Sequence, residues 1–203
     1  MMLRVVGCSH HTSNVEVRER LAFSSDQLRQ ALQAWRETHP DVEAVLLSTC
    51  NRVEFYAAAE STDYLPSAEE VAKFLANCHG LDAAEIADQL FERTGATAVS
   101  HLFSVAASMH SMVVGEPQIL SQVKQAFAIS RENQFAGPLS HSLFEAANRV
   151  AKRVANETSI TRRRVSIPSI AVADYAKGLF ETFDDKKVLL IGAGEMGHET
   201  LTY

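Results

Sequence analysis

Two apolar runs that flank a short polar segment constrain the fold more than any other feature of this sequence. Val45-Leu46-Leu47 leads into Ser48-Thr49-Cys50-Asn51-Arg52, and Val53-Glu54-Phe55-Tyr56-Ala57 leads out of it. Both runs are typical of short buried strands, and apolar residues alternate with period two in the second run. The sequence therefore predicts two strands joined by a bend that carries a thiol, a hydroxyl, an amide and a guanidinium.

Cys50 has two possible roles in this bend. Cys50 and Arg52 are two residues apart, so in extended backbone their side chains would point to the same side of the chain. A cation beside a thiol favours the thiolate, which is the nucleophilic form. A free cysteine is more often a small buried hydrophobic residue, and this segment alone leaves both interpretations open.

The composition is that of a soluble globular protein. The 203 residues are 46% hydrophobic and 22% charged, and they suffice for one core and part of a second domain. The sequence has no apolar run of the ~20 residues that span a bilayer and no signal peptide at its N-terminus. Because Cys8, Cys50 and Cys78 are too few for a disulfide scaffold, we expect free thiols and a cytoplasmic location. The net charge of −6 restricts any RNA contact to local basic patches.

A first strand is expected at residues 3–7, followed by a polar loop. The loop is Cys8-Ser9-His10-His11-Thr12, and its cysteine and histidines suggest a metal site at first sight. The CxxC or HxxxH spacing that marks such sites is missing, so we expect no metal. We interpret the segment as a binding loop in which His10 and Thr12 offer hydrogen bonds.

Three N-cap signals mark helices among the strands. Ser25 and Ser67 each precede an apolar stripe with helical spacing, and Asp82 with Glu85 resembles a capping box. The buried face of the first helix is expected to contain Leu28, Ala31, Leu32 and Trp35. With a further strand at 90–93, the predicted fold class is α/β: an α+β domain with a small sheet packed by helices, βαββαβ-like, followed by more helices.

The second half of the chain is predominantly helical in pattern. One helix is expected to bury a stripe formed by Val99, Leu102, Phe103, Ala106 and Met109. His101 lies off the centre of that stripe, where a surface role and a functional role are both possible. Gly115 is expected to end this helix and Pro117 to open the next. Gln118 and Gln122 lie one turn apart there, either orienting a small anionic ligand or simply solvated.

A basic face is expected on a long helix at residues 139–160. Its projecting side chains are Arg149, Lys152 and Arg153, and Arg162-Arg163-Arg164 follow closely. Such a face can contact RNA phosphates, although a run of charges is more often only solvated. A noncatalytic RNA-binding module that uses the region Arg149–Arg164 is therefore the main alternative to an enzyme.

The end of the sequence has the nucleotide-binding signature G-x-G-x-x-G. Apolar Val188-Leu189-Leu190-Ile191 leads into Gly192-Ala193-Gly194-Glu195-Met196-Gly197, which is the strand-then-glycine context that the motif requires. A dinucleotide-binding βαβ unit needs about 30 residues. We therefore expect residues 161–203 to be a linker helix and the truncated start of a Rossmann domain, in a longer protein whose first domain is 1–160.

These motifs together resemble the glutamyl-tRNA reductase family, NADPH-dependent oxidoreductases that start tetrapyrrole (porphyrin) biosynthesis. The matching segments are Gly7-Cys8-Ser9-His10-His11-Thr12, Arg18-Glu19-Arg20-Leu21-Ala22-Phe23, Leu47–Glu54, His101-Leu102-Phe103, Ser111–Lys124 and Gly192–Gly197. They spread over the whole chain, and the segments around Cys50 and Gly115–Gln122 are highly specific in combination. One departure is His110, which stands where the family usually carries an acidic residue.

The resemblance implies a mechanism and a set of site residues. Cys50 would attack the ester that joins glutamate to tRNA, and hydride from NADPH would reduce the resulting thioester to glutamate-1-semialdehyde. His101 would be important for activity, with its role as base, acid or orienting group left open. The substrate-binding residues would be Thr49, Cys50, Asn51, Arg52, Ser111, Glu116, Pro117, Gln118 and Gln122. The cofactor-binding residues would be Gly192, Ala193, Gly194, Glu195, Met196 and Gly197.

The resemblance also implies partners and a limit on what this chain does. Residues 1–160 would be the catalytic, glutamyl-tRNA-recognising domain, with glutamate-1-semialdehyde aminotransferase as the partner that receives the product. The family forms homodimers through a long C-terminal helix that this sequence lacks. Because the NADPH-binding domain is incomplete, we expect the chain to form the thioester and release glutamate to water without reducing it.

Overall fold

A four-stranded antiparallel sheet in the order β2-β3-β1-β4 forms the centre of the protein. The structure is a computed structural model, and it describes residues 2–160, 168, 170–180, 182–184 and 186–201. The strands are β1 (Met2–Ser9), β2 (Glu43–Thr49), β3 (Arg52–Ala59) and β4 (Phe91–Thr94). The predicted strands on both sides of the polar segment, the first strand and the strand at 90–93 are thus confirmed within one or two residues.

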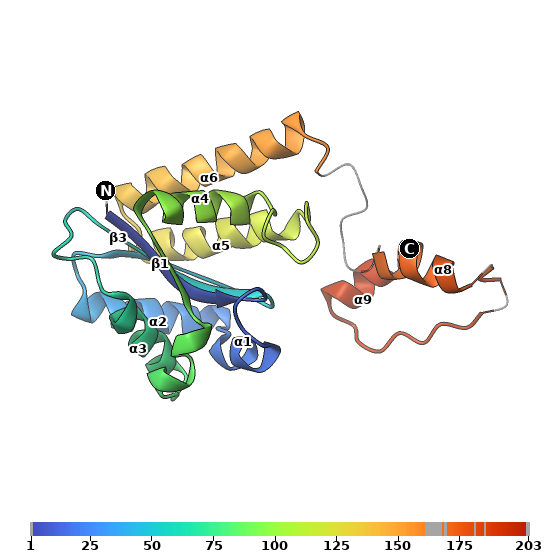
Figure 1. The fold of residues 1–203 in the computed structure, drawn as a ribbon, viewed down its shortest axis with the longest axis horizontal. Coiled ribbons are helices and arrows are strands. Elements are labelled where there is room, and N and C mark those ends of the chain that lie inside the picture. Colours follow the sequence, from blue (N-terminus) through green and yellow to red (C-terminus); the bar gives the residue numbers. More distant parts are fainter. Residues whose placement is uncertain (1, 161–167, 169, 181, 185, 202–203) are drawn as a thin grey trace.

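Helices cover both faces of this sheet (Figure 1). One layer contains α1 (Val15–Leu21), α2 (Ser25–Thr38) and α3 (Ala68–Cys78), followed by the short 3₁₀ turns η1 (Ala83–Glu85) and η2 (Ala87–Gln89). The other layer contains α4 (Gly95–Ala106), α5 (Gln118–Glu132) and α6 (Pro138–Glu157). The predicted fold class, a small sheet packed by helices with further helices after it, is confirmed.

The central strand β3 is buried along its whole length because helices lie on both of its faces. Val53 and Phe55 belong to the core under α2 and α3, whereas Tyr56 and Ala58 belong to the core under α4, α5 and α6. All eight residues of β3 are buried, including Arg52 and Glu54. The period-two alternation in this strand therefore separates two buried faces rather than a buried face from a solvated one.

The capping signals were mostly located correctly. Ser67 and Asp82 are N-caps with complete capping boxes, as predicted. The prediction of Ser25 as the N-cap of α2 is wrong, because the Ser24 side chain accepts the hydrogen bond from the Gln27 backbone N–H and Ser25 is the first helical residue. Adjacent serines offer the same hydroxyl, and only the backbone geometry distinguishes them.

The helix that contains His101 ends earlier than its apolar pattern predicts. Helix α4 ends at Ala106 and not at Gly115, and Met109, expected on its buried stripe, is 53% exposed. Ser108 has a φ of 59°, a left-handed conformation that does not continue a helix. Residues 107–117 consequently form a long loop, which we call the 107–117 loop, between α4 and α5.

The C-terminal segment contains helices but not the predicted strand. The described elements are a π-helix at Ile170–Ala176, α8 (Lys177–Leu179) and α9 (Glu195–Thr200). Val188–Ile191 has no strand structure, and Ile191 is 88% exposed. A strand requires a neighbour to pair its backbone groups, and the described residues around this run provide none. No helix in the described part of the chain is long and apolar enough to cross a membrane.

Candidate active site

Cys50 lies at the tip of the β2-β3 hairpin, in the turn between paired Thr49 and Arg52. The Thr49 Oγ1 atom accepts hydrogen bonds from the backbone N–H groups of Asn51 and Arg52, each at 3.2 Å. These bonds hold the turn although neither Cys50 nor Asn51 has the positive φ that tight hairpin turns usually need. Cys50 is exposed, so the interpretation as a small buried hydrophobic residue is wrong.

A different cysteine has that buried role. All three cysteines are free, as predicted, and Cys8 in β1 is 0% exposed within the core under α1 and α2. Burial raises the pKa of the Cys8 thiol, which keeps it protonated and unreactive. The two thiols differ in exposure because one lies in a buried strand and the other in a solvent-exposed turn.

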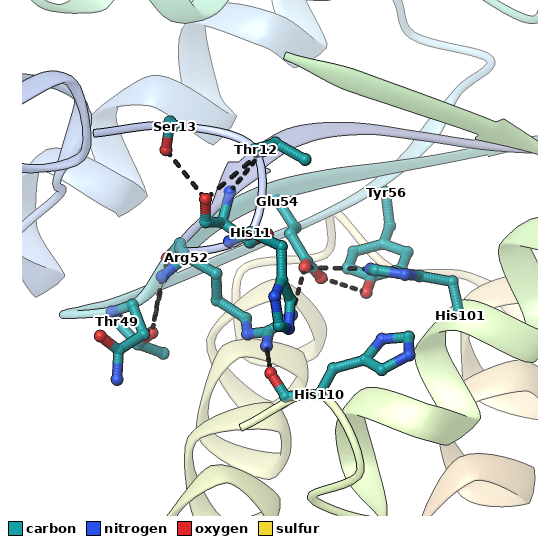
Figure 2. Close-up of polar contacts among 11 residues, drawn as sticks. His11, Thr12, Ser13, Thr49, Arg52, Glu54, Tyr56, His101 and His110 are labelled. Atoms are coloured by element: carbon teal, nitrogen blue, oxygen red, sulfur yellow. Dashed lines mark hydrogen bonds and ion pairs between the residues drawn. The ribbon is translucent and has the colours of Figure 1, made fainter. Parts of the chain in front are cut away.

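The loop after β1 holds the hairpin tip in place. The His10 backbone N–H donates to the Asn51 carbonyl at 3.0 Å, which joins this loop to the turn next to Cys50. Within the loop, the backbone N–H groups of Thr12 and Ser13 both donate to the Ser9 carbonyl at 2.9 Å. The Thr12 and Ser13 hydroxyls donate to the same carbonyl at 3.4 and 3.0 Å (Figure 2). The predicted binding loop is thus a compact turn that supports Cys50 from one side.

The sequence suggested that Arg52 and the Cys50 thiol point to the same side of an extended segment. This arrangement does not apply, and Arg52 is buried. The reason is that Cys50 belongs to a turn, where the alternation of side chains along a strand does not apply. Arg52 is 1% exposed, and its Nη1 atom donates to Glu54 Oε1 at 2.7 Å. Its Nη2 atom donates to the His110 carbonyl, so this guanidinium joins β3 to the 107–117 loop.

Glu54 is the centre of a buried polar network (Figure 2). Its Oε1 atom accepts from Arg52 Nη1 and lies 3.0 Å from His101 Nε2, and its Oε2 atom accepts from the Tyr56 hydroxyl at 2.5 Å. Burial by itself would raise the pKa of this carboxyl, but the His101 hydrogen bond, the Arg52 charge and the Tyr56 hydroxyl together lower it to about 2. Glu54 is therefore a carboxylate at physiological pH.

Imidazole rings from different segments gather near this network. The His101 and His110 ring centroids are 5.5 Å apart, His110 and His11 are 6.3 Å apart, and His11 and His10 are 3.9 Å apart. Burial, followed by the charges of His101 and Arg52, lowers the pKa of His110, which therefore stays neutral near pH 7. Among the described residues, no group of His, Cys, Asp and Glu side chains could hold a metal ion.

The predicted substrate-binding residues outside the hairpin lie in the 107–117 loop and at the start of α5. Ser111 and Glu116 are half-buried loop residues, Pro117 is the N-cap of α5, and Gln118 is its first residue. Gln122 lies one turn further along α5. The Arg52-His110 bond joins this loop to the hairpin. The predicted residues of the hairpin and those of the loop are therefore linked through Arg52.

Gly115 fixes the shape of that loop. Its φ is +92°, and a Cβ atom at this position would lie 2.2 Å from the carbonyl oxygen of Ile160. Only glycine fits both requirements. The loop is further closed by the Ser108 hydroxyl, which donates to the Glu116 carbonyl.

Two of the predicted cofactor-binding glycines, Gly192 and Gly194, precede α9, and Gly197 lies in its first turn. Gly192 has a φ of +117°, and a Cβ atom at Gly197 would lie 2.5 Å from the Gly192 carbonyl oxygen. A glycine-rich segment of this kind at the start of a helix leaves room for the backbone to approach a pyrophosphate. Of Glu195 and Met196 the structure describes only the helical backbone.

The predicted basic face is only partly described. Arg149, Lys152 and Arg153 are exposed on α6, and Arg153 is paired with Glu157 through bonds of 2.9 and 3.1 Å. Arg162-Arg163-Arg164 lie outside the described residues. The exposed Cys50 also differs from the buried cysteine that a noncatalytic RNA-binding module would have.

Sequence reasoning missed Glu54 and Tyr56 as parts of the site. The signal was present, because Arg52, Glu54 and Tyr56 alternate along one face of a strand whose other face is apolar. A polar stripe of this kind in a central strand must find hydrogen-bond partners, since unpaired buried polar groups are costly.

Comparisons with known proteins agree on one family. The family model for "Glutamyl-tRNAGlu reductase, N-terminal domain" matches residues 6–158. Glutamyl-tRNA reductase from Rhodopirellula baltica is 46% identical over 203 residues, covering 100% of this chain and 47% of the relative. The one from Syntrophotalea carbinolica is 42% identical, covering 97% of this chain and 44% of the relative.

A solved structure leads to the same family. "Glutamyl-tRNA Reductase from Methanopyrus kandleri" superposes with a TM-score of 0.68 at 34% identity, covering 98% of this chain and 45% of that chain. The chain thus spans about half the length of the relatives that it matches.

Proposed function

Because the chain belongs to the glutamyl-tRNA reductase family, we propose that it carries the acyl-transfer half of that reaction, with Cys50 as nucleophile. The sulfur of Cys50 attacks the ester carbonyl of glutamyl-tRNA, the C–S bond forms, and the C–O bond to the ribose breaks. The products are a glutamyl thioester on the protein and a tRNA with a free ribose hydroxyl. The observation that carries this proposal is the exposed thiol of Cys50 in the hairpin turn, whose flanking residue Arg52 belongs to the buried Arg52-Glu54-His101 network.

The two segments that meet at Arg52 are proposed to bind the substrate glutamate. Thr49 and Asn51 present an hydroxyl and an amide from the hairpin, and Ser111, Glu116, Pro117, Gln118 and Gln122 are contributed by the 107–117 loop and α5. A carboxylate such as that of Glu116 suits the substrate ammonium group. Arg52 is 1% exposed, so its proposed role is to hold the hairpin and the 107–117 loop together through its bond to the His110 carbonyl. Its buried positive charge lies under both segments.

The reductive half of the reaction is proposed for the whole protein, because relatives are about twice as long as this chain. The Gly192–Gly197 loop would hold the pyrophosphate of NADPH, which fits its glycine geometry. When bound, NADPH supplies the hydride that converts a thioester to an aldehyde. Transfer of glutamate-1-semialdehyde to its aminotransferase and dimerisation of the whole protein are part of the same proposal.

Glutamyl-tRNA with radiolabelled glutamate tests the role of Cys50. The chain is expected to acquire covalent label that hydroxylamine removes, and to release glutamate to water. Cys50→Ser should abolish both, whereas Cys78→Ser, which changes another exposed free cysteine, should leave both intact. Label and release that persist in Cys50→Ser would show that this thiol is not the nucleophile.

The same assay distinguishes the RNA-binding alternative. A noncatalytic module would bind tRNA and leave glutamate attached to it in every variant, with Cys50→Ser indistinguishable from the unmodified chain. Retained ester in the presence of demonstrable tRNA binding would favour that alternative.

A further inference from the structure

Glu54 receives hydrogen bonds from three residues at once, although it does not reach the surface. It is 0% exposed, and its donors are Arg52 on its own strand face, Tyr56 two residues further along, and His101 on α4. A fully buried carboxylate is costly unless its oxygens are paired, so this arrangement requires an explanation. The role of Glu54 inferred from these contacts rests on the proposed function, because it concerns what His101 does in the Cys50 reaction.

The contact between Glu54 and His101 determines which ring nitrogen carries the proton. An ionised carboxylate only accepts hydrogen bonds, so at 3.0 Å from Glu54 Oε1 the Nε2 atom of His101 must be the donor. In a neutral imidazole the other nitrogen, Nδ1, then has the free lone pair. The centroids of the Phe91 and His101 rings are 4.9 Å apart, so Phe91 packs against the imidazole.

Glu54 stays an acceptor because its neighbours keep it ionised. The His101 hydrogen bond, the Arg52 charge and the Tyr56 hydroxyl outweigh the effect of burial and lower the pKa of Glu54 to about 2. Burial and the Glu54 charge raise the pKa of Tyr56, so its hydroxyl remains a donor. Both groups therefore hold the same hydrogen-bonding roles across the pH range in which an enzyme works.

We propose that Glu54 is a positioning residue, which keeps the proton of His101 on Nε2 and makes Nδ1 the nitrogen that exchanges a proton with the reacting groups. Nδ1 takes up, through the solvent that reaches the exposed Cys50, the proton that the thiol releases as the C–S bond forms. The proton returns to the ribose oxygen as the C–O ester bond breaks, so the imidazole ends the step neutral. During the step, the carboxylate of Glu54 stabilises the imidazolium through the Nε2–H bond.

Nitrogen NMR of the His101 ring tests this proposal without any assay of activity. In the ¹⁵N-labelled 203-residue chain, His101 is expected to be the Nε2–H tautomer at pH 8. In Glu54→Gln, the amide offers an acceptor and a donor to Nε2, so a mixture of tautomers is expected. Thioester formation should fall by about 100-fold in this variant with little change in KM for glutamyl-tRNA, because a misplaced general base affects the chemical step.

Glu43→Gln is the matched control. The Glu43 carboxylate accepts from the Leu139 and Ser140 backbone N–H groups at 3.1 and 2.6 Å, at the N-terminus of α6, and β2 places it at the opposite end of the strand from the hairpin. This variant should lower thermal stability while leaving the His101 tautomer and the rate of thioester formation unchanged. A merely structural role for Glu54 predicts that both glutamine variants behave alike.

Two results would overturn the proposal. The first is a proton on Nδ1 of His101 in the unmodified chain, a measurement that needs no variant to fold. The second is an unchanged tautomer and rate in Glu54→Gln. Failure of the proposed function gives a different result. If Cys50 is not the nucleophile, covalent labelling persists in Cys50→Ser, and this result does not depend on the tautomer of His101.

Discussion

The two faces of β3 are buried to the same degree and are stabilised in different ways. On one face, Phe55 lies 4.7 Å from the Trp35 ring and 5.6 Å from the Phe74 ring in an aromatic cluster under α2 and α3. On the other face, Glu54 and its three donors form a hydrogen-bonded network under α4. One strand thus contributes an apolar core to one side and a set of ionised groups to the other.

The comparison shows which face stabilises the fold and which is suited to chemistry. Burial of aromatic rings contributes free energy in proportion to the area removed from water. A buried ion pair such as Arg52-Glu54 contributes little net stability, because desolvation offsets the attraction between its charges. We infer that the apolar face stabilises the fold and that the polar face is present for the site that it supports.

The largest effect is expected from Phe55→Ala. Removing a buried aromatic ring leaves a cavity, so the free energy of unfolding should fall by about 3–5 kcal/mol in chemical denaturation. The folded fraction should retain the His101 tautomer of the unmodified chain, because Phe55 points away from Glu54 across the strand. A changed tautomer would mean that the two faces are coupled.

Tyr56→Phe is expected to have a smaller effect, on the opposite face. The substitution keeps the ring that packs 5.5 Å from Phe144 and removes only the hydroxyl that donates to Glu54. The expected loss is about 1–2 kcal/mol of unfolding free energy, since one acceptor bond of a buried carboxylate is left unmade. A loss as large as that of Phe55→Ala would show that the polar face is also a main source of stability.

A pH-dependent effect is expected from His10, beside the hairpin. Burial, followed by the charges of His11 and Arg52, lowers the pKa of His10 from 6.5 to about 4. As pH falls, His10 is protonated in the unfolded chain before it is protonated in the folded chain. The contribution of His10 to the free energy of unfolding should therefore be fully present above pH 6.5 and be lost as pH falls towards 4. Melting temperatures of His10→Asn should decline less steeply over that range, and equal slopes would exclude a contribution from this ring.

The smallest effect on stability is expected from Cys50→Ser. Because Cys50 is exposed, the free energy of unfolding should change by no more than about 0.5 kcal/mol. Cys8→Ser makes the same atomic change in the core and should cost about 1–3 kcal/mol, because the serine hydroxyl would be buried. The two variants compare the contribution of a thiol to the free energy of unfolding at an exposed position and at a buried one.

The hairpin that carries Cys50 could be predicted from the sequence because it is a local structure. The strands on both sides of Cys50 and the loop after β1 follow from short-range patterns, and motif similarity identified the family before any fold was known. The end of α4 was predicted incorrectly, since the apolar spacing continues through Met109 while the backbone turns at Ser108. The strand at 188–191 did not form, because strand pairing depends on residues that a local pattern does not contain.

The sequence by itself determined the four strands of the sheet, the polar turn with its thiol and the family, since each of these depends on neighbouring residues or on recurring motifs. The tertiary structure alone decided that Cys50 is exposed and Cys8 buried, and that Arg52 joins the hairpin to the 107–117 loop. It also placed His101 against Glu54, 47 residues away in the chain. The physical reason is that a hydrogen bond between distant residues exists only once α4 has packed on the sheet, and no local preference specifies that contact.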